Sequence, residues 1–166
     1  MCAIDPPPHT LAQVVDCHDA VIYALAPLSY AAITACTDCV VVVGAVGRGL
    51  RLERCERVQL IAAARCVAVN TCHDCILYLA ANQAPLLLGD NRFLQLAPYN
   101  SAYERLAAHM AVAGVRPQPN LWDQPLALLP DHSKHHSNHA APGEGGSAPS
   151  SPRRQWQAAA VARELG

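Results

Sequence analysis

Cysteine is the residue type with the most evident chemical potential in this chain, which holds eight cysteines in 166 residues. Cys36/Cys39 and Cys72/Cys75 have the C-x-x-C spacing that supplies thiolates to a structural zinc ion. The same spacing occurs in thioredoxin-like redox sites. No strand–helix–strand pattern surrounds either pair, which weakens the redox interpretation. Zinc binding and thiol redox chemistry are therefore the two activities that the spacing alone suggests.

The cysteines also mark a repeat. The leading cysteine of each unit is followed by two polar residues, a small or apolar residue and an apolar run, and successive units are 19, 19 and 17 residues apart. The leading column is Cys17, Cys36, Cys55 and Cys72, and the fourth position of the units is Ala20, Cys39, Val58 and Cys75. Because the repeat also accounts for the two units without a C-x-x-C pair, it favours two inward structural columns. Zinc and redox roles remain alternatives.

Strand-like segments such as Leu50–Glu53 and Val67–Asn70 precede the units, and Gly44, Gly47 and Gly49 separate the runs. A period just under 20 residues with short strands is typical of a solenoid. We therefore predict an all-β fold, a right-handed parallel β-helix of about four to five coils over residues 14–97.

The remaining segments complete the predicted organisation. Residues 1–13 are an N-terminal extension, and the β-helix domain runs over 14–114. It includes a closing helix at 101–112, capped by Asn100 or Ser101, stopped by Gly114 and covering an end of the β-helix. Residues 115–130 are predicted to be an extended strap, 131–154 a disordered His- and Gly/Ser/Pro-rich linker, and 155–166 a short helix.

Composition excludes several classes of protein. Lys and Arg number 12 against 13 Asp and Glu, so the net charge of −1 argues against a nucleic-acid-binding surface. Residues 20–37 are uncharged, but Pro27 and polar residues interrupt them and they fall within the repeat, which argues against a membrane span. The start of the chain has no secretory pattern, so reduced cytosolic thiols are expected. No cofactor and no catalytic constellation are predicted.

The sequence as a whole resembles a known family. The resemblance rests on the repeating cysteine units and on a tract that runs through Pro85-Leu86-Leu87-Leu88, Asn91, Leu96-Ala97-Pro98-Tyr99, Tyr103, Leu106, His109-Met110 and Asn120-x-Trp122-Asp123-x-Pro125. Over roughly residues 14–126 the chain is similar to the cofactor C-like (C-CAP) domain, in particular to the tubulin-binding cofactor C domain-containing proteins linked to centrosome and Golgi positioning. The resemblance implies a parallel β-helix. Typical members are much longer than this chain.

Two related families stimulate GTP hydrolysis, by tubulin or by an Arf-like small GTPase, and the resemblance implies an arginine inserted from the β-helix face. Such a guanidinium stabilises charge on the transferred phosphoryl group. Alignment on Cys75–Leu79 places that arginine at Ala68 and the preceding glutamine of the motif at Cys66. Alanine cannot do this chemistry. Arg51, one coil earlier, is expected to stack beside Ala68 and is the weak catalytic candidate.

We therefore expect a non-enzymatic cytoskeletal adaptor. The resemblance implies a role in cell morphology at the centrosome, basal body or spindle pole, with tubulin, centrosomal proteins or a small GTPase as partners. The alternatives are a GTPase-activating or tubulin-folding cofactor and, more weakly, an actin-binding role. The predicted partner contacts are Arg51, Glu53, Asn70, Tyr99, Asn100, Tyr103 and His109.

Overall fold

The computed structural model describes residues 10–128. Its elements, in chain order, are β1 (Leu11–Val15), β2 (Val21–Ala24), β3 (Leu28–Thr34), β4 (Val40–Glu53), β5 (Gln59–Ala64), β6 (Val67–Asn70), β7 (Ile76–Ala81), β8 (Leu86–Leu88), β9 (Gln95–Pro98), α1 (Leu106–Ala113) and β10 (Leu126–Leu128). The predicted linker at 131–154 and the predicted helix at 155–166 lie outside the described residues.

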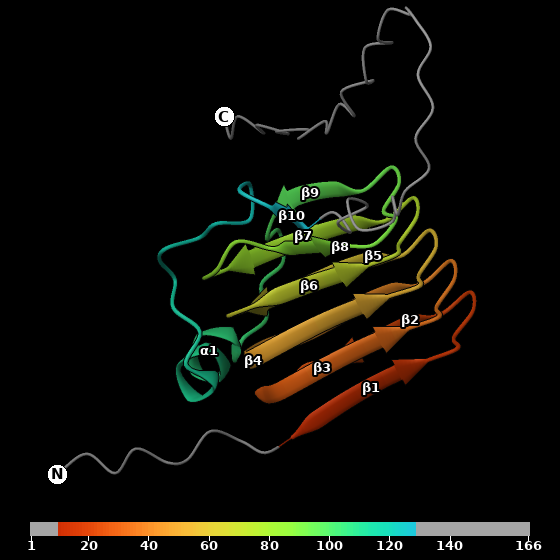
Figure 1. Cartoon of the computed structure of the whole chain (residues 1–166). Helices are drawn as coiled ribbons and strands as arrows, with labels where there is room; N and C mark the ends of the chain where they lie inside the picture. Colours follow the sequence, from red (N-terminus) through yellow and green to blue (C-terminus); the bar gives the residue numbers. More distant parts are fainter. Residues whose placement is uncertain (1–9, 129–166) are drawn as a thin grey trace, which may run out of the picture.

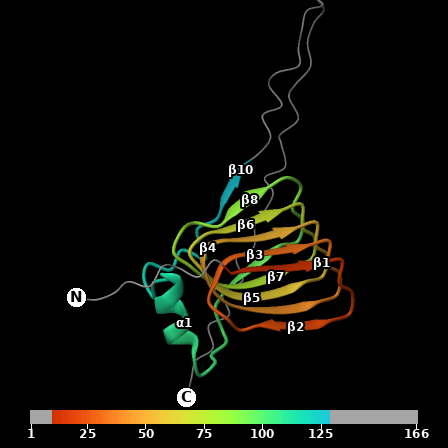
Figure 2. The same cartoon turned by 90° about the horizontal axis from the view of Figure 1, so that it is seen from below.

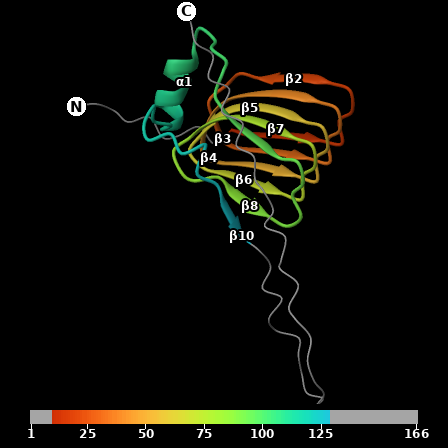
Figure 3. The ribbon, with the colours of Figure 1, turned by 90° about the horizontal axis from the view of Figure 1, so that it is seen from above.

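The strands wind into a parallel solenoid of about five turns, which confirms the predicted β-helix. One flat face consists of β1, β3, the second half of β4, β6, β8 and β10. The other consists of β2, the first half of β4, β5, β7 and β9. In Figure 1 the coils stack from β1 (red) to β9 and β10 (green to cyan), and Figures 2 and 3 show the two faces as opposite walls.

Each coil turns at a corner that carries the cysteine unit. Parallel bridges run along the corner from His18 through Thr37, Glu56 and His73 to Arg92, so equivalent residues stack as the repeat predicted. The residue before each leading cysteine and the second residue after it adopt a positive φ, for example 54° at Asp16 and 48° at Asp19 around Cys17. Aspartate tolerates the left-handed region better than most residues, which explains its recurrence here.

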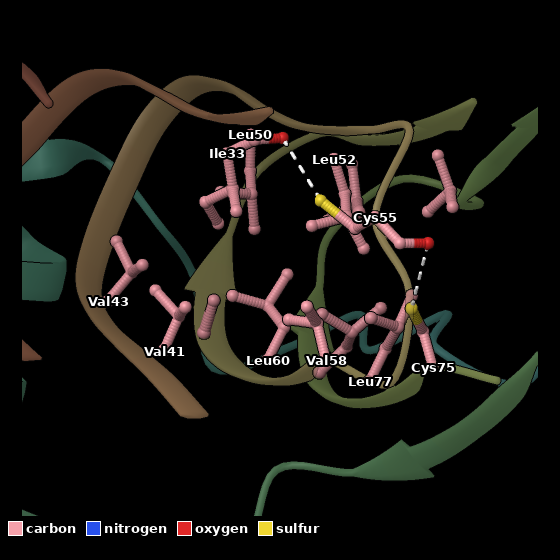
Figure 4. Close-up of a cluster of buried hydrophobic side chains, with 14 of the residues drawn as sticks. Ile33, Val41, Val43, Leu50, Leu52, Cys55, Val58, Leu60, Cys75 and Leu77 are labelled. Atoms are coloured by element: carbon pink, nitrogen blue, oxygen red, sulfur yellow. Dashed lines mark hydrogen bonds between the residues drawn. The ribbon is translucent and has the colours of Figure 1, made fainter. Parts of the chain in front are cut away.

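The core lies between the two faces. Figure 4 shows Ile33, Leu50 and Leu52 from one face opposite Val41, Val43, Leu60 and Leu77 from the other, all buried. This arrangement follows from strand periodicity, because alternate residues of a strand point to the same side. Small and branched side chains fill the narrow interior at high density, and few aromatic side chains are needed.

The helix differs from its prediction in extent and in place. It begins at Leu106 rather than 101, so Asn100 and Ser101 lie too far ahead of its first turn to cap it. The Ser101 hydroxyl donates to Asn100 Oδ1. Gly114 ends the helix at φ 72°, as predicted. The helix lies beside the corner of β4 and not over either end of the solenoid (Figures 1 and 2).

Glycine at position 47 allows this lateral packing. A Cβ at Gly47 would lie 2.2 Å from the carbonyl oxygen of Ala113. The last residue of the helix, Ala113, and Val115 just beyond Gly114 join a second small cluster with Ala45 and Ala63. The helix therefore covers a side of the solenoid, and the end that it was expected to cover depends on other residues.

Both boundaries of the solenoid extend beyond the predicted domain. Strand β1 begins at Leu11, inside the stretch assigned as an extension, because its inward residues Ala12 and Val14 pack on the core. At the other end, the strap over 115–130 includes β10, which pairs in parallel with β8. The predicted extended strap therefore ends in a strand of the sheet.

Candidate partner-binding surface

Arg51 lies at the centre of one flat face. Its neighbours Leu50 and Leu52 point into the core, so the alternation of β4 directs the Arg51 side chain outward. We call the outward positions of β1, β3, the second half of β4, β6, β8 and β10 the Arg51 face. In the register of the sheet, Arg51 is stacked between Ala32 and Ala68. The predicted adjacency of Arg51 and Ala68 is therefore correct.

The Arg51 guanidinium is exposed and ion-paired. Its Nε lies 2.9 Å from Glu53 Oε1, and the Arg51 side chain is 60% exposed against 22% for Glu53. The small alanines on either side leave the guanidinium open to solvent along the face. Exposed pairs of this kind add little stability, so the arginine is available to a carboxylate or phosphate of a partner that displaces Glu53.

Most of the surface around this pair is apolar. Leu126 and Leu128 of β10 are exposed, and Leu86 and Leu88 of β8 are half-buried beside them. Towards the other end, the Arg48 guanidinium lies 5.9 Å from the centre of the exposed Tyr30 ring. A flat apolar surface with aromatic and arginine side chains has the composition of protein interfaces.

Asn70 and Glu53 are stacked neighbours on this face, with Thr34 on the far side of Glu53. Both are half-buried. The predicted contacts Arg51, Glu53 and Asn70 thus lie together on one face.

The other predicted contacts form a separate group around α1. The Tyr103 hydroxyl lies 3.1 Å from His109 Nδ1, and the two rings pack at 5.5 Å between centroids. His109 is only 8% exposed. Tyr99 packs against the second cluster, and burial raises the pKa of both tyrosines. These three side chains hold the helix on the solenoid, and Asn100 alone of this group is exposed.

The two cysteine columns lie inside the corner, as the repeat predicted. Cys36, Cys39, Cys55, Cys72 and Cys75 are buried free thiols, and Cys17 at the first coil is half-buried. Their sulfurs donate to backbone carbonyls, as from Cys55 to Ile33 at 3.7 Å and from Cys75 to Cys55 at 3.6 Å (Figure 4). Buried cysteine here acts as a small apolar residue that also satisfies corner carbonyls.

The thiols of the two columns differ in the direction of their pKa shifts. Burial raises the pKa of the Cys36 thiol to about 11. The pKa of Cys72 is also raised, because its thiol contacts the thiols of Cys55 and Cys75. The same contacts lower the pKa of Cys55 to about 7 and lower the pKa of Cys75. Within residues 10–128, no group of three or more His, Cys, Asp or Glu side chains is placed to hold a metal ion. Five of the six column thiols are buried, which suits a packing role.

The sequence analysis missed a second surface. The outward residues of β2, the first half of β4, β5, β7 and β9 carry no charge; they are Val21, Tyr23, Val40, Val42, Gln59, Ile61, Ile76, Tyr78, Gln95 and Ala97. A signal was present, because the unbroken run Val40–Val43 places apolar residues on both sides of the strand. Only the inward half of that run was interpreted.

Residues of the family-like tract also have defined roles in the structure. Asn91 occupies the cysteine position of the last corner, where its Oδ1 accepts the Cys72 N–H at 2.9 Å and its Nδ2 donates to the Leu88 carbonyl. Asn120 Oδ1 accepts the Ala81 N–H at 2.9 Å. Trp122 packs against the main core. These side chains close the last coil of the solenoid.

No helix within residues 10–128 is long and apolar enough to cross a membrane.

Comparisons with known proteins agree with this geometry. The family described as tubulin binding cofactor C matches residues 10–127, almost the whole described range. TBCC domain-containing protein 1 of Homo sapiens is 32% identical over 117 residues, 70% of this chain and 21% of the relative. The Danio rerio protein of that name is 34% identical over 110 residues, 66% of this chain and 19% of the relative. This chain thus covers about a fifth of those relatives. The match over most of its length shows that the chain belongs to the tubulin binding cofactor C family.

Proposed function

We propose that this chain is a non-enzymatic adaptor that binds a cytoskeletal protein through the Arg51 face. The proposal rests on the residues at two stacked positions of the sheet, Arg51 and Ala68. Alanine stands where the resemblance implies a catalytic arginine, and the neighbouring arginine is engaged with Glu53. A rigid parallel sheet with an apolar surface and one central ion pair is suited to holding a protein partner.

The family name supports tubulin as the first partner to test. Tubulin dimers are titrated against the wild-type chain and against an Arg51→Glu, Leu126→Glu double variant, whose positions are both exposed. A Gln59→Glu, Gln95→Glu variant on the uncharged face is the matched control. We expect wild type and control to bind alike and the Arg51-face variant to bind at least about tenfold more weakly, through loss of apolar and arginine contacts.

Equal loss in both variants, or loss in the control alone, would contradict the use of the Arg51 face. Absence of binding by the folded wild-type chain would remove tubulin as the partner. Circular dichroism melting of all three proteins distinguishes either result from misfolding.

A role in centrosome or Golgi positioning is the finer part of this proposal and rests on the resemblance to the relatives. The tagged chain is expressed in cells and imaged with a pericentriolar marker. We expect co-localisation that the Arg51→Glu, Leu126→Glu variant loses. A diffuse signal for the wild-type chain would contradict a positioning role for this domain alone.

The alternative is a GTPase activator that uses Arg51. The observation in its favour is the outward, 60% exposed guanidinium stacked directly on the position of the missing arginine. Insertion of Arg51 into a nucleotide site would require it to leave Glu53. Single-turnover hydrolysis, described at the end of the Discussion, separates this alternative from the adaptor.

A further inference from the structure

The exposed arginines of the solenoid differ in whether a carboxylate neutralises them. Two of the three arginines at the cysteine corner are ion-paired. Arg57 Nε lies 2.6 Å from Asp38 Oδ1, and Arg92 Nη2 lies 2.7 Å from Asp90 Oδ2. The Arg51 guanidinium is paired in the same way on the flat face. At these places the chain itself neutralises most of its positive charge.

We call the opposite corner of each coil, against which α1 packs, the helix corner. Figure 1 shows α1 at one edge of the Arg51 face and the turns of the cysteine corner at the other edge. Three exposed arginines, Arg48, Arg65 and Arg116, lie at the helix corner or just after α1. Within residues 10–128, none of the three pairs with a carboxylate. Their positive charge is therefore accessible to another molecule.

Arg48 and Arg65 lie on neighbouring coils. The Arg65 N–H donates to the Val46 carbonyl at 3.0 Å, and the Leu50 N–H donates to the Cys66 carbonyl at 2.9 Å. The two arginines therefore stand opposite one another between these hydrogen bonds. Neighbouring strands of a sheet are about 4.8 Å apart, and like charges at such positions destabilise the sheet. A bound carboxylate would remove this repulsion, so the arrangement favours an anionic partner.

Arg116 is joined to these two arginines through the side chain of Asn82. The Gln83 N–H donates to the Arg65 carbonyl at 3.0 Å, which places Asn82 and Gln83 on the coil after Arg65. Asn82 Oδ1 accepts the Arg116 N–H at 2.8 Å, and Asn82 Nδ2 donates to the Arg116 carbonyl at 2.7 Å. Two hydrogen bonds thus hold the backbone of Arg116 at the helix corner. We call Arg48, Arg65 and Arg116 the arginine row.

The Arg48 side chain is oriented by an aromatic ring. Its guanidinium lies 5.9 Å from the centre of the Tyr30 ring, which is itself 48% exposed on the Arg51 face. A cation–π contact of this kind fixes the plane of the guanidinium and leaves N–H groups at its edge for a carboxylate. The arginine row therefore begins beside the apolar surface of the Arg51 face.

The distribution of charge indicates which kind of anion fits the row. The carboxylates of the cysteine corner outnumber its arginines; they are Asp16, Asp19, Asp38, Glu56, Asp74 and Asp90 against Arg54, Arg57 and Arg92. The two edges of the Arg51 face thus differ in the sign of their charge. A membrane surface or a nucleic acid duplex wide enough to cover the face would also meet the acidic edge. A narrow acidic segment of a protein can follow the arginine row and avoid that edge.

We propose that an acidic segment of a partner protein binds along the arginine row, with its carboxylates on Arg48, Arg65 and Arg116. This inference rests on the proposed adaptor function and names the chemistry of the partner, which contacts the Arg51 face and carries acidic residues beside that contact. Each guanidinium can bind a carboxylate through two parallel N–H···O hydrogen bonds. Charged contacts at the edge of an interface favour fast and selective association.

The first test uses a fluorescein-labelled peptide of alternating glutamate and glycine, titrated with the 166-residue chain and followed by fluorescence anisotropy. We expect saturable binding that weakens severalfold between about 50 and 300 mM NaCl, and no binding of the peptide with glutamine in place of glutamate. Absence of binding at low salt, or equal binding of the glutamine peptide, would overturn the proposal.

Anionic vesicles test the choice of a protein segment over a membrane. The chain is sedimented with vesicles of phosphatidylcholine and phosphatidylserine at a salt concentration at which the glutamate peptide is bound. We expect the chain to stay in the supernatant, because a vesicle surface also meets the carboxylates of the cysteine corner. Sedimentation with the vesicles would overturn the proposal in favour of a lipid surface.

Paired charge reversals locate the contact. Arg48→Glu with Arg65→Glu changes the arginine row, and Arg54→Glu with Arg92→Glu is the control with the same change in net charge at exposed positions of the cysteine corner. Because a short peptide depends on its charge pairs, we expect the first variant to bind it at least about tenfold more weakly and the control to change little. Arg48→Lys with Arg65→Lys should retain most of the binding. With all variants folded by circular dichroism, equal loss in the control would overturn the proposal.

The peptide assay is independent of tubulin, so the two proposals can fail separately. Binding of the glutamate peptide without binding of tubulin would support the arginine row and remove tubulin as the partner. Tubulin binding that depends on the Arg51 face, with no binding of the peptide, would overturn the arginine row and leave the adaptor function in place.

Discussion

The two ends of this solenoid are built from the same repeat but finished differently. At the last coil, Asn91 replaces the column cysteine and hydrogen-bonds the corner, while Asn120 and Trp122 of the strap fasten across the end. At the first coil, Ala12 and Val14 are half-buried, whereas Leu87, Leu94 and Leu96 of the last coil are buried. The two ends of the described solenoid therefore differ in how far their core residues are buried.

This comparison also explains which residues carry the family resemblance. Asn91, Asn120 and Trp122 belong to the tract that looks specific to the family, and each of them closes the last coil. Tyr103 and His109 hold α1 to the side of the solenoid. The residues that carry the family resemblance therefore stabilise the last coil and the helix of the β-helix. They give little information about what the flat faces bind.

The largest effect is expected at the last coil. Trp122→Ala removes a large side chain from the core and exposes the last coil, which should lower the free energy of unfolding by about 2–3 kcal/mol. Tyr23→Ala, which removes an aromatic side chain that is 67% exposed in the first coil, is the control and should cost far less. Urea denaturation measures both. Similar losses would show that the two ends do not differ as described.

Asn91→Ala should have the next largest effect. It leaves the buried Cys72 N–H without its acceptor and the Leu88 carbonyl without its donor, at a cost of about 1–2 kcal/mol. Asn91→Asp keeps an acceptor oxygen and, when the new carboxyl group is protonated, a donor for the Leu88 carbonyl as well, so it should retain part of that stability below the pKa of that group. A neutral result in urea denaturation for Asn91→Ala would mean that this corner does not depend on the asparagine.

Thiol reactivity should follow the cysteine column from the first coil inward. Half-buried Cys17 should react with iodoacetamide faster than buried Cys36, as measured by peptide mass spectrometry. Because the pKa of Cys36 is raised to about 11, only about one Cys36 side chain in 1,000 is a thiolate at pH 8. Equal rates at the two positions would contradict the packing of the column.

The same pKa shift predicts the alkaline behaviour of the fold. The Cys36 pKa is raised in the folded state, so its contribution to stability is complete below the ordinary value of 9.0 and is lost as pH rises towards about 11. The free energy of unfolding should therefore fall across that interval. Cys36→Ala, measured at the same pH values, should show a shallower fall. An identical pH profile in the variant would exclude this thiol as the cause.

The smallest effect concerns the corner of the last coil. Phe93 is 77% exposed at φ 52°, where the earlier coils carry Asp19, Asp38, Arg57 and Asp74. Since a bulky apolar residue is strained in this region and aspartate is tolerated, Phe93→Asp should stabilise the fold by about 0.5 kcal/mol. The reciprocal Asp74→Phe should destabilise it by a similar amount. A loss of stability in Phe93→Asp would indicate an unrecognised apolar contact.

Periodicity was enough to predict the solenoid and the register of its corner. Cysteines at steps of 19, 19 and 17 required stacked coils, and the alternation of Leu50–Glu53 correctly directed Arg51 outward and beside Ala68. These features depend on local pattern and repetition, which a single sequence records directly.

The parts that the sequence did not predict depend on long-range packing. The helix at 106–113 lies against β4 because Gly47 admits the backbone of Ala113, a contact between residues far apart in the chain. His109 and Tyr103 were predicted to contact a partner, but they contact each other, and His109 is buried while Tyr103 is half-buried. The uncharged face was not predicted, because only the inward residues of the run Val40–Val43 were interpreted and its outward residues were not. Sequence spacing alone cannot distinguish a residue that braces the fold from one that meets a partner.

Single-turnover GTP hydrolysis is the most direct test of the adaptor account. Tubulin and a panel of Arf-like small GTPases are assayed with the wild-type chain and with Arg51→Ala, and Ala68→Arg restores an arginine at the position implied by the family. An inserted arginine is worth about 10³–10⁵ in rate. The account predicts no acceleration by wild type or by Arg51→Ala. A many-fold acceleration by wild type that Arg51→Ala abolishes would contradict it and assign the catalytic arginine to the neighbouring coil.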